Sequence, residues 1–335
     1  MSDGLVQIDS SHSKMHSFER LLLSRPLIGP ATVLILATIA FSLFTENFGT
    51  LQNASIVIQQ VQIVALLGVA QTLIILTAGI DLSVAAVMIL SQVAMGKFAV
   101  VVGFPVWVAL ILGIVVGVLC GLINGLVVTK LNIPPFIATL GSLSIFHAIN
   151  IFISAGQSIP YADVPKLLNF LGEGIKFFGT TFTYGQFLTV AIFIIVGYML
   201  KFTAWGSRVY AVGDNIQAAR LTGIRVDAVL LSVYIFAGFI VGIAGWLLIG
   251  RIGSISPTAG ADYNLASITA VVIGGTSLFG GRGRIMGTLL GALIVGVFSS
   301  GLSLAGLDNL WQEFTIGLLI IGAVAVDQRL RAIGR

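Results

Sequence analysis

The polar side chains that interrupt the long apolar stretches of this sequence are mostly neutral amides and hydroxyls. Such groups can exchange hydrogen bonds with the hydroxyl groups of an uncharged polar solute as it crosses an apolar region. Alternatively, they can hydrogen-bond between neighbouring helices, where a bond contributes about 0.6 kcal/mol on average. Both interpretations stay open at this point. The candidates for a solute path are Gln59, Gln62, Gln71, Asn124, Thr139 and Asn150.

The side-chain sets that enzymes need are not found in the sequence. His147 is the only histidine outside the first 26 residues, and we expect it to be packed and hydrogen-bonded. No Gly-x-Ser-x-Gly nucleophile elbow and no Gly-x-x-x-x-Gly-Lys-Ser/Thr phosphate loop occurs. We therefore expect no catalytic residue, no metal site and no bound cofactor in this chain, and any ATP that drives its function must be bound by another polypeptide.

Two glycine-containing breaks between apolar runs carry polar residues. Asp81 and Ser83 follow the first break, where Asp81 can either cap the next helix or form part of a gate at the mouth of a path. The second break contains Gly274, Gly275 and Arg282. These five residues are predicted to lie at one mouth of the bundle.

A polar loop over residues 203–227 contains a short predicted helix between two glycines. Asp214 or Asn215 can cap its start, and Gly223 suits its end. Its small and apolar residues form a knob that can fit the cleft of a partner, although the composition alone favours an ordinary solvated loop helix. The residues of this candidate site are Gly213, Asp214, Asn215, Ala218, Ala219, Arg220, Leu221, Gly223 and Ile224.

The elements that must position these residues are membrane-spanning helices. The 335 residues are 57% hydrophobic and 9% charged, with a mean hydropathy of +1.07, whereas soluble domains are about a quarter charged. A span needs roughly 20 apolar residues, so the composition predicts an all-α, polytopic membrane protein with about ten transmembrane helices. The predicted spans are residues 27–44, 57–79, 84–102, 106–128, 134–154, 186–201, 228–250, 264–275, 285–304 and 312–326.

The cations predict the orientation of these spans, because cytoplasmic loops carry an excess of Lys and Arg. With both termini inside, the cytoplasmic segments hold all the cations except Lys97, Lys166, Lys176 and Arg251. The predicted organisation is a cytoplasmic tail over 1–26, a transmembrane domain over 27–328 and a cytoplasmic tail over 329–335. Within the domain, residues 155–184 form an external loop, either an interfacial helix or a docking surface, and 203–227 lie inside.

Three longer strings resemble the permease subunits of bacterial monosaccharide ATP-binding cassette (ABC) importers. They are Gly79-Ile80-Asp81-Leu82-Ser83, then Ala211-Val212-Gly213-Asp214-Asn215 with Ala218-Ala219-Arg220-Leu221 and Gly223-Ile224, and the run Ala270 to Gly283. The resemblance covers about residues 30 to 328. Within the family, Thr203-Ala204-Trp205-Gly206 and Leu310-Trp311-Gln312-Glu313-Phe314-Thr315 are most similar to the fructose-importing branch.

This resemblance implies a multi-pass protein of the bacterial inner membrane that moves a monosaccharide by alternating access. Fructose is favoured over ribose, xylose or galactose. The implied partners are a cytoplasmic ABC ATPase that uses the ATP, a periplasmic sugar-binding protein, and a second permease copy, with a homodimer favoured over a heterodimer. The helix within 203–227 becomes the coupling helix for the ATPase. The alternative is an ion-coupled secondary transporter, which is disfavoured because no carboxylate is evident in the middle of a span.

Overall fold

The computed structural model describes residues 27–177 and 180–333, and every predicted apolar run in that range is helical. The all-α fold class is confirmed. The ten helices that correspond to the predicted spans are α2 (Ile28–Phe44), α3 (Leu51–Leu76), α4 (Val84–Gly96), α5 (Val106–Lys130), α6 (Pro135–Ser154), α8 (Tyr184–Phe202), α11 (Val226–Ile252), α12 (Tyr263–Ile273), α13 (Ile285–Leu304) and α14 (Asn309–Ile333).

Within the described residues, seven of these helices are long and apolar enough to cross a membrane, α4 by continuing into a π-helical turn at Lys97–Val101. The apolar stretches of α2, α12 and α14 are shorter. The helix α14 runs to Ile333 and therefore extends into the segment predicted as a tail. The N-terminal tail lies outside the described residues.

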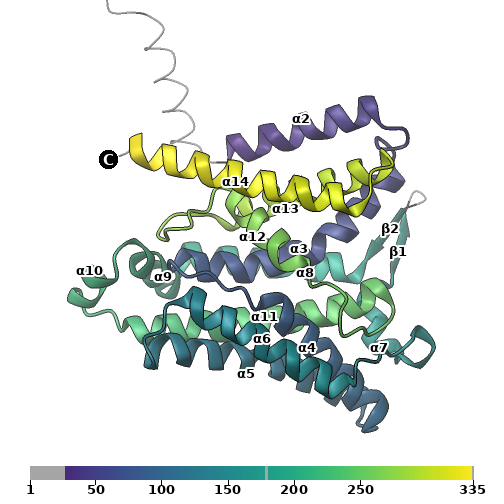
Figure 1. Cartoon of the computed structure of the whole chain (residues 1–335), viewed down its shortest axis with the longest axis horizontal. Helices are drawn as coiled ribbons and strands as arrows, with labels where there is room; N and C mark the ends of the chain where they lie inside the picture. The colour runs from purple at the N-terminus through teal and green to yellow at the C-terminus, as the bar shows by residue number, and fades with distance from the viewer. Residues whose placement is uncertain (1–26, 178–179, 334–335) are drawn as a thin grey trace, which may run out of the picture.

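The helix α3 forms the centre of the bundle. Every residue from Val61 to Leu76 is buried, as expected for a helix that is apolar on all sides. The helix α3 contacts α4, α8, α11, α12 and α13. In Figure 1, α2 and α14 cover one side of the bundle, and α5 and α6 lie on the opposite side.

The helices α5 and α11 pack with their backbones in contact. A Cβ atom at Gly117 would lie 2.6 Å from the Gly238 carbonyl oxygen and 2.9 Å from the Gly242 Cα, so only glycine fits there. This close approach is the use of small residues that membrane helix pairs favour. The outward side of α5 is instead apolar and exposed at Trp107, Ile111, Leu119 and Ile123, as a lipid-facing surface requires.

The connections gather at two opposite ends of the bundle (Figure 1). One end carries α9 (Ala204–Asp214) and α10 (Ile216–Leu221). The other end carries α7 (Lys166–Asn169) and an antiparallel hairpin of β1 (Gly174–Phe177) and β2 (Thr180–Thr183). The amphipathic pattern at 164–170 predicts the first of these elements, but not the hairpin.

Candidate functional site

Two of the strings singled out in the sequence meet at the carbonyl group of Leu76, where α3 ends, three residues before the first string begins. The Gly281 N–H donates a hydrogen bond to this oxygen at 3.0 Å. Gly213, at the end of α9, lies so close that a Cβ there would overlap the same oxygen. Gly280 packs against Ala78 in the same way, since a Cβ added at Gly280 would lie 2.8 Å from the Ala78 Cβ. We call these five residues the motif junction.

The connection between α12 and α13 reaches this junction through a series of glycines with positive φ. Gly275, Gly280 and Gly281 have φ angles of +83°, +84° and +70°, which favour glycine. The Tyr210 hydroxyl of α9 donates to the Gly283 carbonyl at 2.9 Å and fixes the connection to α9. Burial raises the pKa of Tyr210, although nearby Arg284 opposes the shift, so this hydroxyl remains a donor at neutral pH.

The break between α3 and α4 is organised around Asp81, which is 5% exposed. Its Oδ1 accepts from both the backbone N–H and the hydroxyl of Ser83, each at 2.6 Å. Because Ser83 precedes the first residue of α4, and that helix has no side-chain cap, Asp81 shapes the loop and does not cap the helix. The expectation of a cap is wrong here, since the carboxylate accepts from Ser83, two residues further along the chain.

Side chains from α3 and from three other helices hold the backbone and side chains of this break. The Asn124 amide of α5 donates to the Ser83 hydroxyl at 2.8 Å, and the Thr139 hydroxyl of α6 accepts from the Leu82 N–H at 3.1 Å. The Asn264 amide of α12 donates to the Leu82 carbonyl at 2.6 Å. Gln71 of α3 donates to the Asp81 carbonyl. Buried amides and hydroxyls therefore fix an irregular segment inside the bundle.

The six neutral residues predicted for a solute path do not lie together. Three of them, Gln71, Asn124 and Thr139, hold the break just described. The others lie toward the hairpin end, where Gln59 donates to the Thr181 carbonyl at 3.0 Å, Gln62 accepts from the Thr183 hydroxyl at 3.4 Å, and Asn150 donates to the Pro257 carbonyl at 2.6 Å.

The prediction that His147 is packed and hydrogen-bonded differs from what the structure shows. This residue is exposed on the outer surface of α6, next to exposed Ser144 and Ala148, and is not packed inside the chain. Periodicity alone does not show which face of an apolar helix is turned outward, so the sequence could not place this side chain.

The predicted helix in the 203–227 loop is α10. The Asn215 side chain caps it by accepting from the Ala218 N–H at 3.0 Å, and Gly223 follows it with φ +83°. Ala219 is buried against the chain, but Leu221 is 89% exposed. Of the predicted knob, Ala218 and Leu221 are therefore exposed, and the leucine is the larger apolar side chain.

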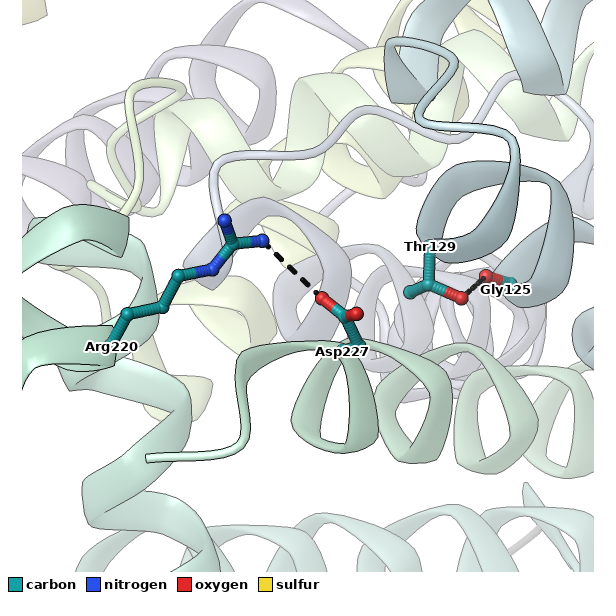
Figure 2. Close-up of polar contacts among 4 residues, drawn as sticks. All are labelled: Gly125, Thr129, Arg220 and Asp227. Carbon is teal, nitrogen blue, oxygen red and sulfur yellow. Dashed lines mark hydrogen bonds and ion pairs between the residues drawn. The ribbon is translucent and has the colours of Figure 1, made fainter. Parts of the chain in front are cut away.

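A hollow of about 250 Å³ lies between α10, the end of α5 and the break after α3. At its edge, Arg220 of α10 faces Asp227 at the start of α11 with an N–O distance of 3.4 Å (Figure 2). Figure 2 also shows Thr129, whose hydroxyl donates to the Gly125 carbonyl of α5 at 2.7 Å. Both charged side chains are more than half exposed, so this ion pair contributes at most about 1 kcal/mol.

Sequence reasoning missed three residues of this region. Tyr210, Tyr234 and Asn264 each place a polar side chain near the break or the motif junction. Tyr234 stands in a largely apolar run and Asn264 at the start of one, so a polar residue within or beside such a run was the available signal. No such signal could predict which segments meet at Leu76. They meet at its backbone carbonyl group, and every residue has such a group.

The chain matches known proteins over nearly its full length. A family model described as branched-chain amino acid transport system / permease component matches residues 53–324. The fructose import permease protein FrcC of Rhizobium meliloti is 49% identical over 329 residues, covering 96% of this chain and 91% of the relative.

Two further relatives extend the comparison. The ribose import permease protein RbsC of Bacillus subtilis (strain 168) is 38% identical, with 91% of this chain and 94% of the relative covered. The autoinducer 2 import system permease protein LsrC of Yersinia pseudotuberculosis serotype O:3 (strain YPIII) is 33% identical, with 90% and 85% covered. The chain therefore belongs to the family of branched-chain amino acid transport system / permease components and is a multi-pass membrane permease.

Proposed function

We propose that this permease is the membrane-spanning subunit of an ABC importer that moves a monosaccharide, with fructose as the substrate. The observation that carries the proposal is the motif junction, which joins the end of α9, directly before the exposed helix α10, to the end of α3 and to the connection between α12 and α13. Movement imposed on α10 from outside the chain would reach the centre of the bundle there.

The charges support placing the α9–α10 end in the cytoplasm. The segments at this end carry Lys130, Lys201, Arg208, Arg220, Arg225, Arg282 and Arg284, and those at the hairpin end carry Lys97, Lys166, Lys176 and Arg251. Positively charged connections stay on the cytoplasmic side. On this orientation, residues 203–227 form the cytoplasmic coupling loop, and the tails 1–26 and 329–335 are cytoplasmic as well.

The helix α10 is proposed to dock into a groove of a separate ATPase subunit, which hydrolyses the ATP. Leu221 is its most exposed apolar side chain, at 89%, and Arg220 and Arg225 are exposed beside it. An apolar anchor surrounded by polar residues is the arrangement found at the centre of protein interfaces. The chain itself has no phosphate loop.

At the opposite end, we propose that the loop 155–184 receives a periplasmic sugar-binding protein. Its apolar side chains are exposed at Tyr161 (71%) and Ile175 (54%), close to Lys166 and Lys176. A second copy of the permease completes the channel. The gate at the cytoplasmic mouth is proposed to comprise Asp81, Ser83, Gly274, Gly275 and Arg282.

Fructose is proposed because the relative with that substrate in its name shares 49% of its residues with this chain, compared with 38% for the ribose permease of Bacillus subtilis. The solute path is proposed to use neutral hydrogen-bonding residues, among which Gln59, Gln62, Gln71, Asn124, Thr139 and Asn150 are the candidates.

The test is uptake of labelled fructose into proteoliposomes that contain the permease, the ATPase and the binding protein encoded beside its gene. We expect uptake that requires ATP and continues when an ionophore removes ion gradients. Uptake that persists without ATP and collapses with the ionophore would instead establish an ion-coupled secondary transporter. ATP-driven uptake of ribose but not fructose would overturn the proposed substrate alone.

A further inference from the structure

A small cavity lies beside Asp81, between α4, α5 and α11. It is lined by Asp81, Val84, Gly121, Asn124, Tyr234 and Gly238, among others. Its volume of about 10 Å³ is that of roughly one water-sized sphere. The backbone contact of α5 with α11 at these glycines keeps the space this small.

Two of the groups around this cavity have unused hydrogen-bonding capacity. The Tyr234 hydroxyl is buried, with the side chain 1% exposed, and has no hydrogen-bond partner among the described residues. Asp81 Oδ2 receives only a long contact of 3.5 Å from the Asn124 amide, because both short bonds go to Oδ1. A buried polar group left without a partner is destabilising, so an occupant that supplies the missing hydrogen bonds is favoured.

We propose that this cavity binds one water molecule, which joins the Tyr234 hydroxyl to the Asp81 carboxylate. The water accepts the Tyr234 O–H and donates one of its own hydrogens to Oδ2, so that both groups are satisfied. Buried waters occupy polar sites with two to four such partners. A hard metal cation is a poorer occupant, because it takes about six oxygen ligands and only three lining residues carry side-chain oxygens.

The Tyr234 side chain lies between the proposed water site and a larger hollow. The same side chain also lines the larger hollow beneath α10, and its hydroxyl lies 3.3 Å from the position that a Cβ at Gly79 would occupy. Tyr234 therefore separates the water site from that hollow. The bound water links α11 to the break between α3 and α4, beside the motif junction.

The direct test is an electron cryo-microscopy structure of the full-length permease in lipid nanodiscs at about 2 Å resolution. We expect a density peak within hydrogen-bond distance, about 2.7–3.0 Å, of both the Tyr234 hydroxyl and an Asp81 carboxylate oxygen. The Tyr234→Phe variant should lose this peak or show it displaced. An empty cavity, a direct Tyr234–Asp81 bond, or a peak surrounded by five or six oxygens would each overturn the water site.

Thermal stability gives an independent readout with a matched control. Tyr234→Phe leaves the water with one partner fewer, and the apparent Tm should fall by about 2–4 °C. Tyr263→Phe makes the same change at a tyrosine that does not line the cavity and should leave the Tm unchanged. Equal Tm values for Tyr234→Phe and the unmodified chain would contradict the proposed bond.

Discussion

Truncating Leu221 to alanine should separate ATPase docking from folding. The side chain is 89% exposed at the tip of α10, so nearly all of its surface is free to be buried by a partner. Complete burial of a leucine contributes about 1.5–3 kcal/mol. A loss of about 2 kcal/mol corresponds to a roughly 30-fold weaker Kd. Because the chain itself covers so little of this side chain, its own stability should change by less than about 0.5 kcal/mol.

The assay is the binding of purified ATPase to the permease in nanodiscs, measured alongside the thermal unfolding of the permease alone. Leu51→Ala is the matched control, because this leucine is 72% exposed at the opposite end of α3. We expect a higher Kd for Leu221→Ala only, together with uptake that falls in proportion to occupancy. An unchanged Kd for Leu221→Ala, or an equal loss for the control, would refute α10 as the docking element.

Three further substitutions test individual contacts within the permease. Gly213→Ala places a Cβ against the Leu76 carbonyl and should destabilise the chain by about 1–3 kcal/mol. Gly141→Ala is the control, because a Cβ added at this helix position meets no atom within 4 Å. Thermal unfolding of both variants should show a loss of stability for Gly213→Ala alone. Asn124→Ala removes the donor to the serine of the break and should cost about 1–3 kcal/mol of unfolding free energy, measured by denaturant titration in detergent; no loss would contradict the role of this amide. Arg220→Ala breaks an exposed ion pair and should change stability by less than about 1 kcal/mol, so a larger loss in the same titration would show that the pair is more important than its exposure indicates.

The helices were predictable because a membrane span requires a long apolar run, and each of the ten runs is a helix. The short helix α10 was also predictable, because Asn215 and Gly223 are the residues that helix ends favour. The hairpin over 174–183 was not, since its strands are four residues each and alternate too briefly for a periodic pattern.

The candidate functional site could be predicted only in part, because the sequence shows residue types but not how helix backbones approach or rotate. Asp81 and the glycine breaks stand out in the sequence because they interrupt apolar helices. The convergence of Gly213 and Gly281 on Leu76 depends on close backbone approach, which glycine permits but does not specify. Whether an amide such as Asn124 faces a path or a neighbouring helix depends on the rotation of α5, and the structure turns it toward Ser83.

The central claim is that α10 transmits the action of a separate ATPase to this permease. Photo-cross-linking in native membrane vesicles tests it directly, with a benzophenone amino acid placed at position 221 or, at the opposite end, at position 161. We expect a covalent adduct with the ATPase from position 221 and none from position 161. An ATPase adduct from position 161, with none from 221, would contradict both the orientation of the chain and the role of α10.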